Sequence, residues 1–182
     1  GIFILPLVLP PTVVGFGLLL LFGKHGPLGK LLSLIGTTVV FSWPATVISA
    51  VVMSFPLMYM TARGGFEQVE PDIEDAARTL GASEWKVFWT VTVPLAWPSI
   101  AAGTVLALAR SLGEFGATLM LAGNIPGKTA TIPIAIYFAV QAGDMDKALT
   151  LVLVTVVIAF GSLATIAYWK GRRLRTWVVP IY

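Results

Sequence analysis

The sequence predicts an all-α protein that spans a membrane about four times. Its 182 residues are 57% hydrophobic and only 12% charged, with a mean hydropathy of +0.87. Soluble domains carry about 25% charged residues, so lipid is the main solvent expected for this chain. Four apolar segments are long enough to cross about 30 Å of hydrocarbon as helices that rise 1.5 Å per residue. The absence of cysteine excludes disulfides and thiolate metal sites.

The first two expected spans cover residues 2–22 and 43–61. The first contains no charge, and three prolines interrupt its first half: Pro6, Pro10 and Pro11. Proline removes a backbone donor and bends a helix. The segment is therefore either a kinked packing helix or a helix that lines a translocation path, with Pro10 and Pro11 as candidate lining residues. In the second span, Pro56 predicts another kink.

The third expected span, residues 95–121, contains Arg110 and Glu114 on one helix face. A charge at membrane depth costs at least about 2.5 kcal/mol, so such groups turn inward and pair. The pair either locks this helix to its neighbours, or Arg110 takes part in passing an anion. Gly113 and Gly116 flank Glu114 and predict a loosened or broken helix, and both are candidate lining residues.

The C-terminal part of the chain predicts the topology. Residues 131–143 are too few for an ordinary span and fit a re-entrant or interfacial helix. The fourth span, residues 148–169, is followed by four cations: Lys170, Arg172, Arg173 and Arg175. Lys and Arg are enriched at cytoplasmic span ends, so we expect a cytoplasmic C-terminus. Four spans then make residues 65–94 a cytoplasmic loop.

Residue types that carry catalysis or bind metals are scarce. His25 is the only histidine and lies in a Gly-Lys-His-Gly-Pro turn, where a solvated side chain is commoner than a ligand or base. An intramembrane protease would need a base beside Ser162, and the spans contain no histidine. Residues 127–129 resemble the end of a phosphate-binding loop, but Ala122 stands where its first glycine is required. We therefore expect a non-catalytic chain without a cofactor or metal.

The loop 65–94 is a polar island that holds six of the nine acidic residues. A helix over residues 67–80 is expected to stop at Gly81, as glycine commonly ends helices. Ser83 can then cap a second, short helix, and Pro94 and Pro98 are expected to end it.

Three aromatic residues share one face of that second helix at i, i+3 and i+4: Trp85, Phe88 and Trp89. Such a face either lies in the lipid interface or docks into a groove on another protein. The residues alone leave both readings open.

The spacing within the loop resembles a signature of ABC-importer permeases. Residues 75–77 (Asp-Ala-Ala) are followed after three residues by Gly81, and after nine more by residues 91–94 (Val-Thr-Val-Pro). The family's EAA loop reads E-A-A, three residues, G, nine residues and I-x-L-P, so Asp75 replaces the usual Glu. The resemblance implies docking to a cytoplasmic ATPase, chiefly through residues 81–89. The coupling residues implied are Glu74, Asp75, Ala76, Ala77, Gly81, Ala82, Ser83, Trp85, Phe88, Trp89 and Pro94.

Further segments resemble permeases of molybdate importers, and also those of sulfate/thiosulfate importers. They read ILPLVLPPTVVGFG, VMSFPLM, AARTLGAS, RSLGEFGATLMLAGNIPG and TIPIAIY. Within LGEFGAT, Phe115 and Ala117 make the resemblance to molybdate permeases stronger than that to sulfate/thiosulfate permeases. The resemblance implies a type I importer permease core as one domain over residues 1–182, with at least one more span upstream of Gly1.

That family works by alternating access in a bacterial or archaeal cell membrane. The partners implied are a second permease copy, a dimer of ABC ATPase subunits in the cytoplasm and an oxyanion-binding protein outside, with no nucleic acid. The substrate expected is molybdate or tungstate, with sulfate as the alternative. An ion-coupled transporter or channel would need acidic relays in the bilayer, where the expected spans offer only Glu114.

Overall fold

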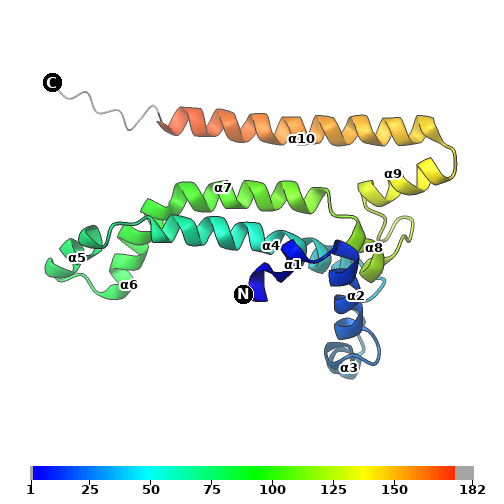
Figure 1. Ribbon diagram of the computed structural model, residues 1–182, viewed down its shortest axis with the longest axis horizontal. Coiled ribbons are helices and arrows are strands. Elements are labelled where there is room, and N and C mark those ends of the chain that lie inside the picture. The colour runs from blue at the N-terminus through cyan, green and yellow to red at the C-terminus, as the bar shows by residue number, and fades with distance from the viewer. Residues whose placement is uncertain (1, 175–182) are drawn as a thin grey trace. The chain divides into compact units, whose positions relative to one another are not determined.

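The computed structural model describes residues 2–174, with side chains over residues 3–161. The described secondary structure is helical throughout (Figure 1). The chain divides after Thr129 into two compact units. The first unit contains η1 (Ile2–Ile4), α1 (Leu5–Val8), α2 (Pro11–Phe22), α3 (Pro27–Leu34), α4 (Trp43–Glu67), α5 (Pro71–Thr79), α6 (Glu84–Val87), η2 (Phe88–Thr92), α7 (Val93–Leu112) and α8 (Gly116–Ala122). The second contains α9 (Ile132–Gln141) and α10 (Met145–Leu174).

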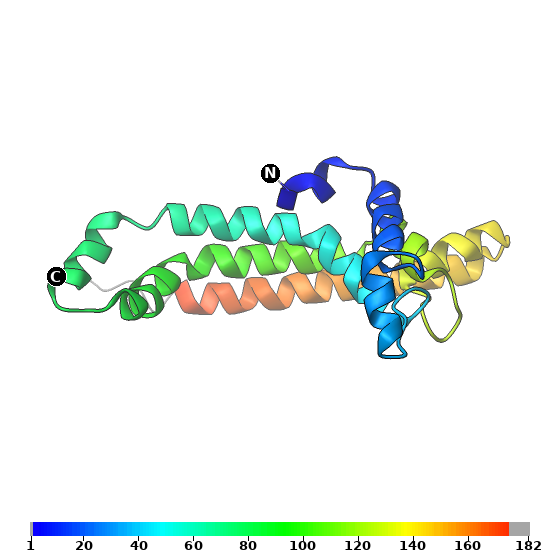
Figure 2. The ribbon, with the colours of Figure 1, turned by 90° about the horizontal axis from the view of Figure 1, so that it is seen from below.

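Helices α4 and α7 run side by side and form the main body of the first unit (Figures 1 and 2). Small residues bring their backbones close, as is common between membrane helices. A Cβ atom added to Gly65 would lie 2.4 Å from Ser99 Cβ, and one added to Gly103 would lie 3.0 Å from Thr61 Cβ. Helix Trp43–Glu67 and the continuous helical segment Glu84–Leu112 each contain an 18-residue window that is apolar enough to cross a membrane.

The prediction of one span over residues 2–22 is wrong. Helix α1 ends at Val8, and Leu9 has an extended backbone with φ −77° and ψ 145°. Leu9 precedes Pro10, and a residue before proline is sterically driven out of the helical region. Helix α2 then has 12 residues and is only about 18 Å long. Helices α2 and α3 together, bent by 43°, form a further candidate span.

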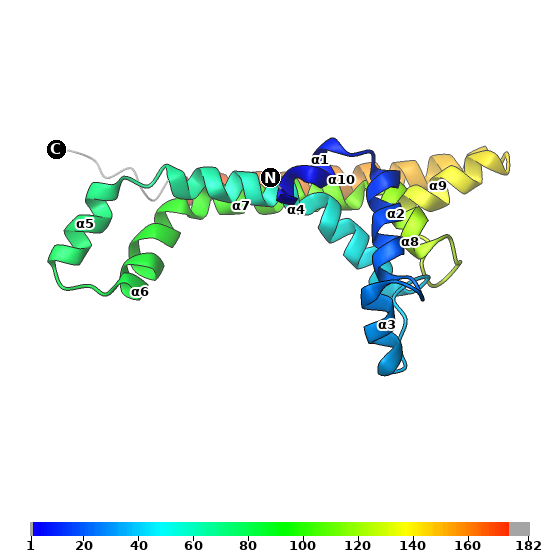
Figure 3. The same ribbon diagram turned by 60° about the horizontal axis from the view of Figure 1, so that its bottom comes forward.

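The helix break predicted around residues 113–116 is confirmed, because α7 ends at Leu112 and α8 begins at Gly116. Helix α8 packs against α2 and α4 (Figure 3). Its Leu121 and Ala122 form a core with Leu18 and Ala45. The third span therefore ends nine residues earlier than expected, and the short α8 belongs to the packing core.

In the second unit, α9 has 10 residues, which confirms the short helix expected over residues 131–143. Helix α9 packs against α10, and Asp144 Oδ1 accepts a hydrogen bond from the Lys147 N–H at the start of α10, at 3.1 Å. The expected fourth span lies within α10. The cationic side chains that predict its orientation, and all of Arg175, lie outside the described residues.

Candidate functional site: the loop between α4 and α7

The loop between α4 and α7 carries α5 and α6 at one end of this helix pair (Figure 3). Gly81 ends α5 as predicted, with φ +85°, a backbone conformation that favours glycine. The Gly81 N–H donates to the Arg78 carbonyl at 2.9 Å, and the Ala82 N–H donates to the Ala77 carbonyl at 3.2 Å. These two bonds form the Schellman motif that satisfies the last carbonyls of a helix. The chain therefore turns sharply between α5 and α6.

Ser83 is the N-cap residue of α6, as predicted, although its side chain makes no capping hydrogen bond. The expected end of the second helix is wrong. Pro94 and Pro98 do not end the helix, because α6 continues through η2 into α7. Segment η2 is a π-helical turn in which the Val93 N–H donates to the Phe88 carbonyl five residues back. Pro94, which has no backbone N–H to donate, directly follows this π-helical turn and lies at the start of α7.

The shared aromatic face is confirmed. The ring centroids of Trp85 lie 6.4 Å from Phe88 and 5.8 Å from Trp89, and those of Phe88 and Trp89 are 5.2 Å apart. Trp85 is 73% exposed and Trp89 is 52% exposed, and Leu80 beside the turn is 88% exposed. An apolar patch of this kind marks an interaction surface.

Arg78 connects the two helices of the loop, a role that the sequence interpretation missed. Its Nε and one terminal nitrogen lie 2.8 and 3.1 Å from the two carboxylate oxygens of Glu84. Its other terminal nitrogen donates to Asp75 Oδ1 at 2.6 Å, while the nitrogen that contacts Glu84 also lies 3.3 Å from Glu74 Oε2. The hydrogen bonds from Arg78 lower the pKa of the Glu84 carboxyl below its ordinary value. Spacings of three and four residues could have indicated the two contacts within α5, but the contact with Glu84 depends on the turn.

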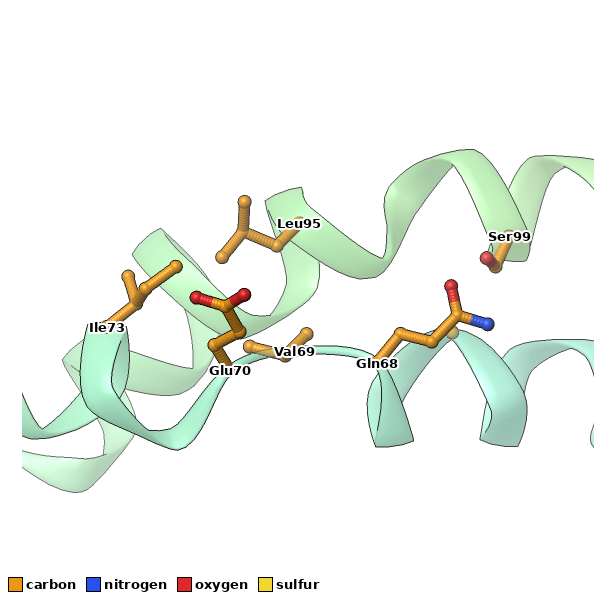
Figure 4. Close-up of a pocket in the computed structure, with 7 residues that line it drawn as sticks. Gln68, Val69, Glu70, Ile73, Leu95 and Ser99 are labelled. Carbon is orange, nitrogen blue, oxygen red and sulfur yellow. The ribbon is translucent and has the colours of Figure 1, made fainter.

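A groove of about 310 Å³ opens at the base of the loop. It is bordered by the end of α4, the non-helical link 68–70, α5 and the start of α7 (Figure 4). Its lining residues are Gly65, Gln68, Val69, Glu70, Ile73, Leu95 and Ser99. The link between α4 and α5 therefore forms one side of this groove.

Arg110 and Glu114 form an ion pair across the helix break, with 2.7 Å between a guanidinium nitrogen and Glu114 Oε2. The Glu114 side chain is 2% exposed and that of Arg110 is 29% exposed. Glu114 Oε1 also accepts a hydrogen bond from the Ala117 N–H at 2.9 Å. The carboxylate thus joins the end of α7 to the start of α8. The expectation that the pair lies within a single helix is therefore wrong.

The four candidate lining residues differ in their surroundings. Pro11 and Gly116 pack together, because a Cβ atom added to Gly116 would lie 3.0 Å from Pro11 Cβ. Pro10 and Gly113 are exposed at the two breaks. The structure therefore brings one pair of them together, in a packing contact between α2 and α8.

Within the described residues, no group of three or more His, Asp or Glu side chains is placed to hold a metal ion. The buried Thr129 hydroxyl accepts a hydrogen bond from the Ile125 N–H at 3.0 Å. Thr129 therefore stabilises the loop that contains residues 127–129.

Residues 1–176 match the family described as the binding-protein-dependent transport system inner membrane component. The chain belongs to this family and is a multi-pass component of a membrane transport system.

The chain is 55% identical over 159 residues to YvgM of Bacillus subtilis, covering 87% of this chain and 70% of that protein, whose name assigns it provisionally to molybdenum transport. It is 50% identical over 170 residues to ModB of Escherichia coli K12, a molybdenum transport system permease protein, covering 92% of this chain and 74% of ModB. CysW of Synechococcus elongatus, a sulfate transport system permease protein, is 35% identical over 168 residues, covering 92% of this chain and 59% of CysW.

Proposed function

We propose that this chain is the transmembrane subunit of an ATP-driven importer that carries molybdate into the cytoplasm. The observation that carries the proposal is the set of relatives named for molybdenum transport, at 43–55% identity for YvgM and two ModB proteins, against 35% for the sulfate permease. Tungstate has the same oxyanion chemistry and belongs to the same proposal.

The loop between α4 and α7 is the docking element in this proposal. Exposed Trp85 and Trp89 stand beside exposed charged residues, which suits a loop that lies in water and meets a protein groove. ATP hydrolysis takes place on the partner ATPase subunits, and the permease contributes only movement. The loop and the C-terminus lie in the cytoplasm.

Transport then follows from alternating access. Closure of the two ATPase subunits on ATP draws together the α6 segments of two permease copies. Because α6 continues into α7 without a break in helical structure, its displacement passes directly into a membrane-spanning helix. The oxyanion enters from a binding protein outside and leaves towards the cytoplasm.

Competition for uptake tests the substrate. Cells that carry the whole transporter are given labelled molybdate with unlabelled molybdate, tungstate or sulfate, and cells without the ATPase subunit serve as the control. We expect molybdate and tungstate to suppress uptake at concentrations at which sulfate has little effect. Equal competition by sulfate would assign the chain to sulfate transport instead.

A further inference from the structure

We infer that Arg78 is a positioning residue that clamps α5 to α6 across the Gly81 turn, so that the loop moves as one rigid docking unit. The inference rests on the proposed docking function of the loop. It concerns how α5 and α6 keep their relative orientation while the ATPase subunits move, which the family and the relatives' names do not address.

The first argument is the geometry around the guanidinium group. Arg78 faces both oxygens of Glu84 on α6, in the fork arrangement that gives an arginine–carboxylate pair both strength and direction. On the opposite side it holds Asp75 of α5 at 2.6 Å. A single side chain therefore binds carboxylates before and after the turn.

A second tether ties α5 to the base of the loop. The Thr92 hydroxyl donates a hydrogen bond of 2.5 Å to Glu74 Oε1, and the other oxygen of Glu74 lies 3.3 Å from Arg78. Helix α5 is thus joined to the continuous segment formed by α6, η2 and α7 at two places. Its connection to α4 is the non-helical link 68–70 beside the groove (Figure 4).

Polar contacts are the main restraint on α5, because the apolar side chains of this helix are at most partly covered. None of the nine residues of α5 is buried. Gly81 offers no steric restraint either, since a Cβ atom there would meet nothing within 4 Å. Single exposed ion pairs contribute little, but a bidentate pair within a network restrains orientation more firmly. Without Arg78, only the Thr92–Glu74 hydrogen bond and the two backbone bonds of the turn would resist a change in the angle between α5 and α6.

The test uses Arg78→Ala with Arg63→Ala as the matched control. Arg63 also binds a carboxylate at i,i+4, with its Nε 2.7 Å from Glu67 Oε1, but this pair joins two residues of α4 only. The complete transporter is reconstituted in vesicles, the assembled complex is quantified, and uptake per ATP hydrolysed is measured. Because a networked ion pair shifts an orientation equilibrium modestly, we expect this ratio to fall roughly two- to fivefold in Arg78→Ala and to stay unchanged in Arg63→Ala.

Distance measurements separate positioning from folding. The 182 residues contain no cysteine, so Asp72→Cys and Lys86→Cys place spin labels on α5 and α6. We expect the label-to-label distance distribution to broaden in Arg78→Ala, to narrow partly in Arg78→Lys and to be unaffected in Arg63→Ala. The measurement also works on the permease alone in detergent if the variant complex does not assemble.

An unchanged uptake-to-hydrolysis ratio in assembled Arg78→Ala complexes, or an unchanged distance distribution, would overturn the inference. These outcomes differ from failure of the proposed function, in which the unsubstituted protein would transport without any ATPase subunit. The distance distribution tests the clamp in either case.

Discussion

Arg110 near the end of α7 forms an ion pair with Glu114 in the break before α8, with 2.7 Å between a guanidinium nitrogen and Glu114 Oε2. The buried Glu114 carboxylate also accepts a hydrogen bond from the Ala117 N–H. One side chain therefore balances a charge and satisfies a backbone donor at the start of α8. Both interactions set the direction in which α8 follows α7.

Removing only the arginine should destabilise the protein strongly. Arg110→Ala leaves the nearly inaccessible Glu114 carboxylate without a counter-charge, and breaking a buried pair in this way costs about 3–5 kcal/mol. The double variant Arg110→Ala with Glu114→Gln removes that charge and keeps an oxygen for the Ala117 N–H, so it should recover much of the loss. Thermal unfolding in detergent measures both variants. A double variant no more stable than Arg110→Ala would contradict the pairing.

The contact between α2 and α8 should tolerate no added carbon at Gly15. A Cβ atom there would lie 2.7 Å from Ala117 Cα and 2.9 Å from Met120 Cβ. Such overpacking typically costs about 1–3 kcal/mol, because backbones must shift apart. Gly17→Ala, two residues along the same helix, meets nothing within 4 Å and serves as the control. Equal melting temperatures for Gly15→Ala and Gly17→Ala would refute the close approach.

Gly81→Ala should weaken docking through backbone strain alone. The new methyl group has free space, but the left-handed conformation at φ +85° costs a non-glycine residue about 1–2 kcal/mol. We expect the affinity for the ATPase subunit to fall by roughly 5- to 30-fold. Asn tolerates this conformation better, so Gly81→Asn should lose less. If Gly81→Ala bound the ATPase as tightly as the unsubstituted protein, the turn would not control docking.

The pKa of Glu84 should depend on Arg78. The hydrogen bonds from Arg78 lower this pKa in the folded loop, so the contribution of Glu84 to loop stability is present above the ordinary glutamate pKa. It is lost as the pH falls through the lowered value. Carboxyl NMR titration, with Glu84→Gln to assign the signal, should show the pKa rising towards its ordinary value in Arg78→Ala. An identical titration in both proteins would exclude the bidentate contact.

The sequence predicted elements best where a single residue controls the local backbone. Gly81 marked the end of α5 because the left-handed conformation favours glycine, and the glycines beside Glu114 marked the break before α8. Hydrophobic pattern and proline position were less informative. Pro10 divides the first apolar segment into short helices, whereas Pro94 lies within a continuous helical path.

The difference between these two prolines depends on backbone geometry that the sequence does not display. The π-helical turn before Pro94 rearranges the hydrogen bonds around the proline. The clamp at Arg78 was hidden for a related reason. Its bond to Glu84 spans six residues and exists only because the Gly81 turn brings the two side chains together.

The coupling between loop and transport can be measured in vesicles that contain the permease, the ATPase subunits and the binding protein. We predict that labelled molybdate accumulates only with ATP, that a proton gradient without ATP drives no uptake, and that Trp85→Asp abolishes uptake by removing the exposed apolar anchor at α6. Uptake driven by a proton gradient alone, or normal ATP-dependent uptake in Trp85→Asp, would contradict the account.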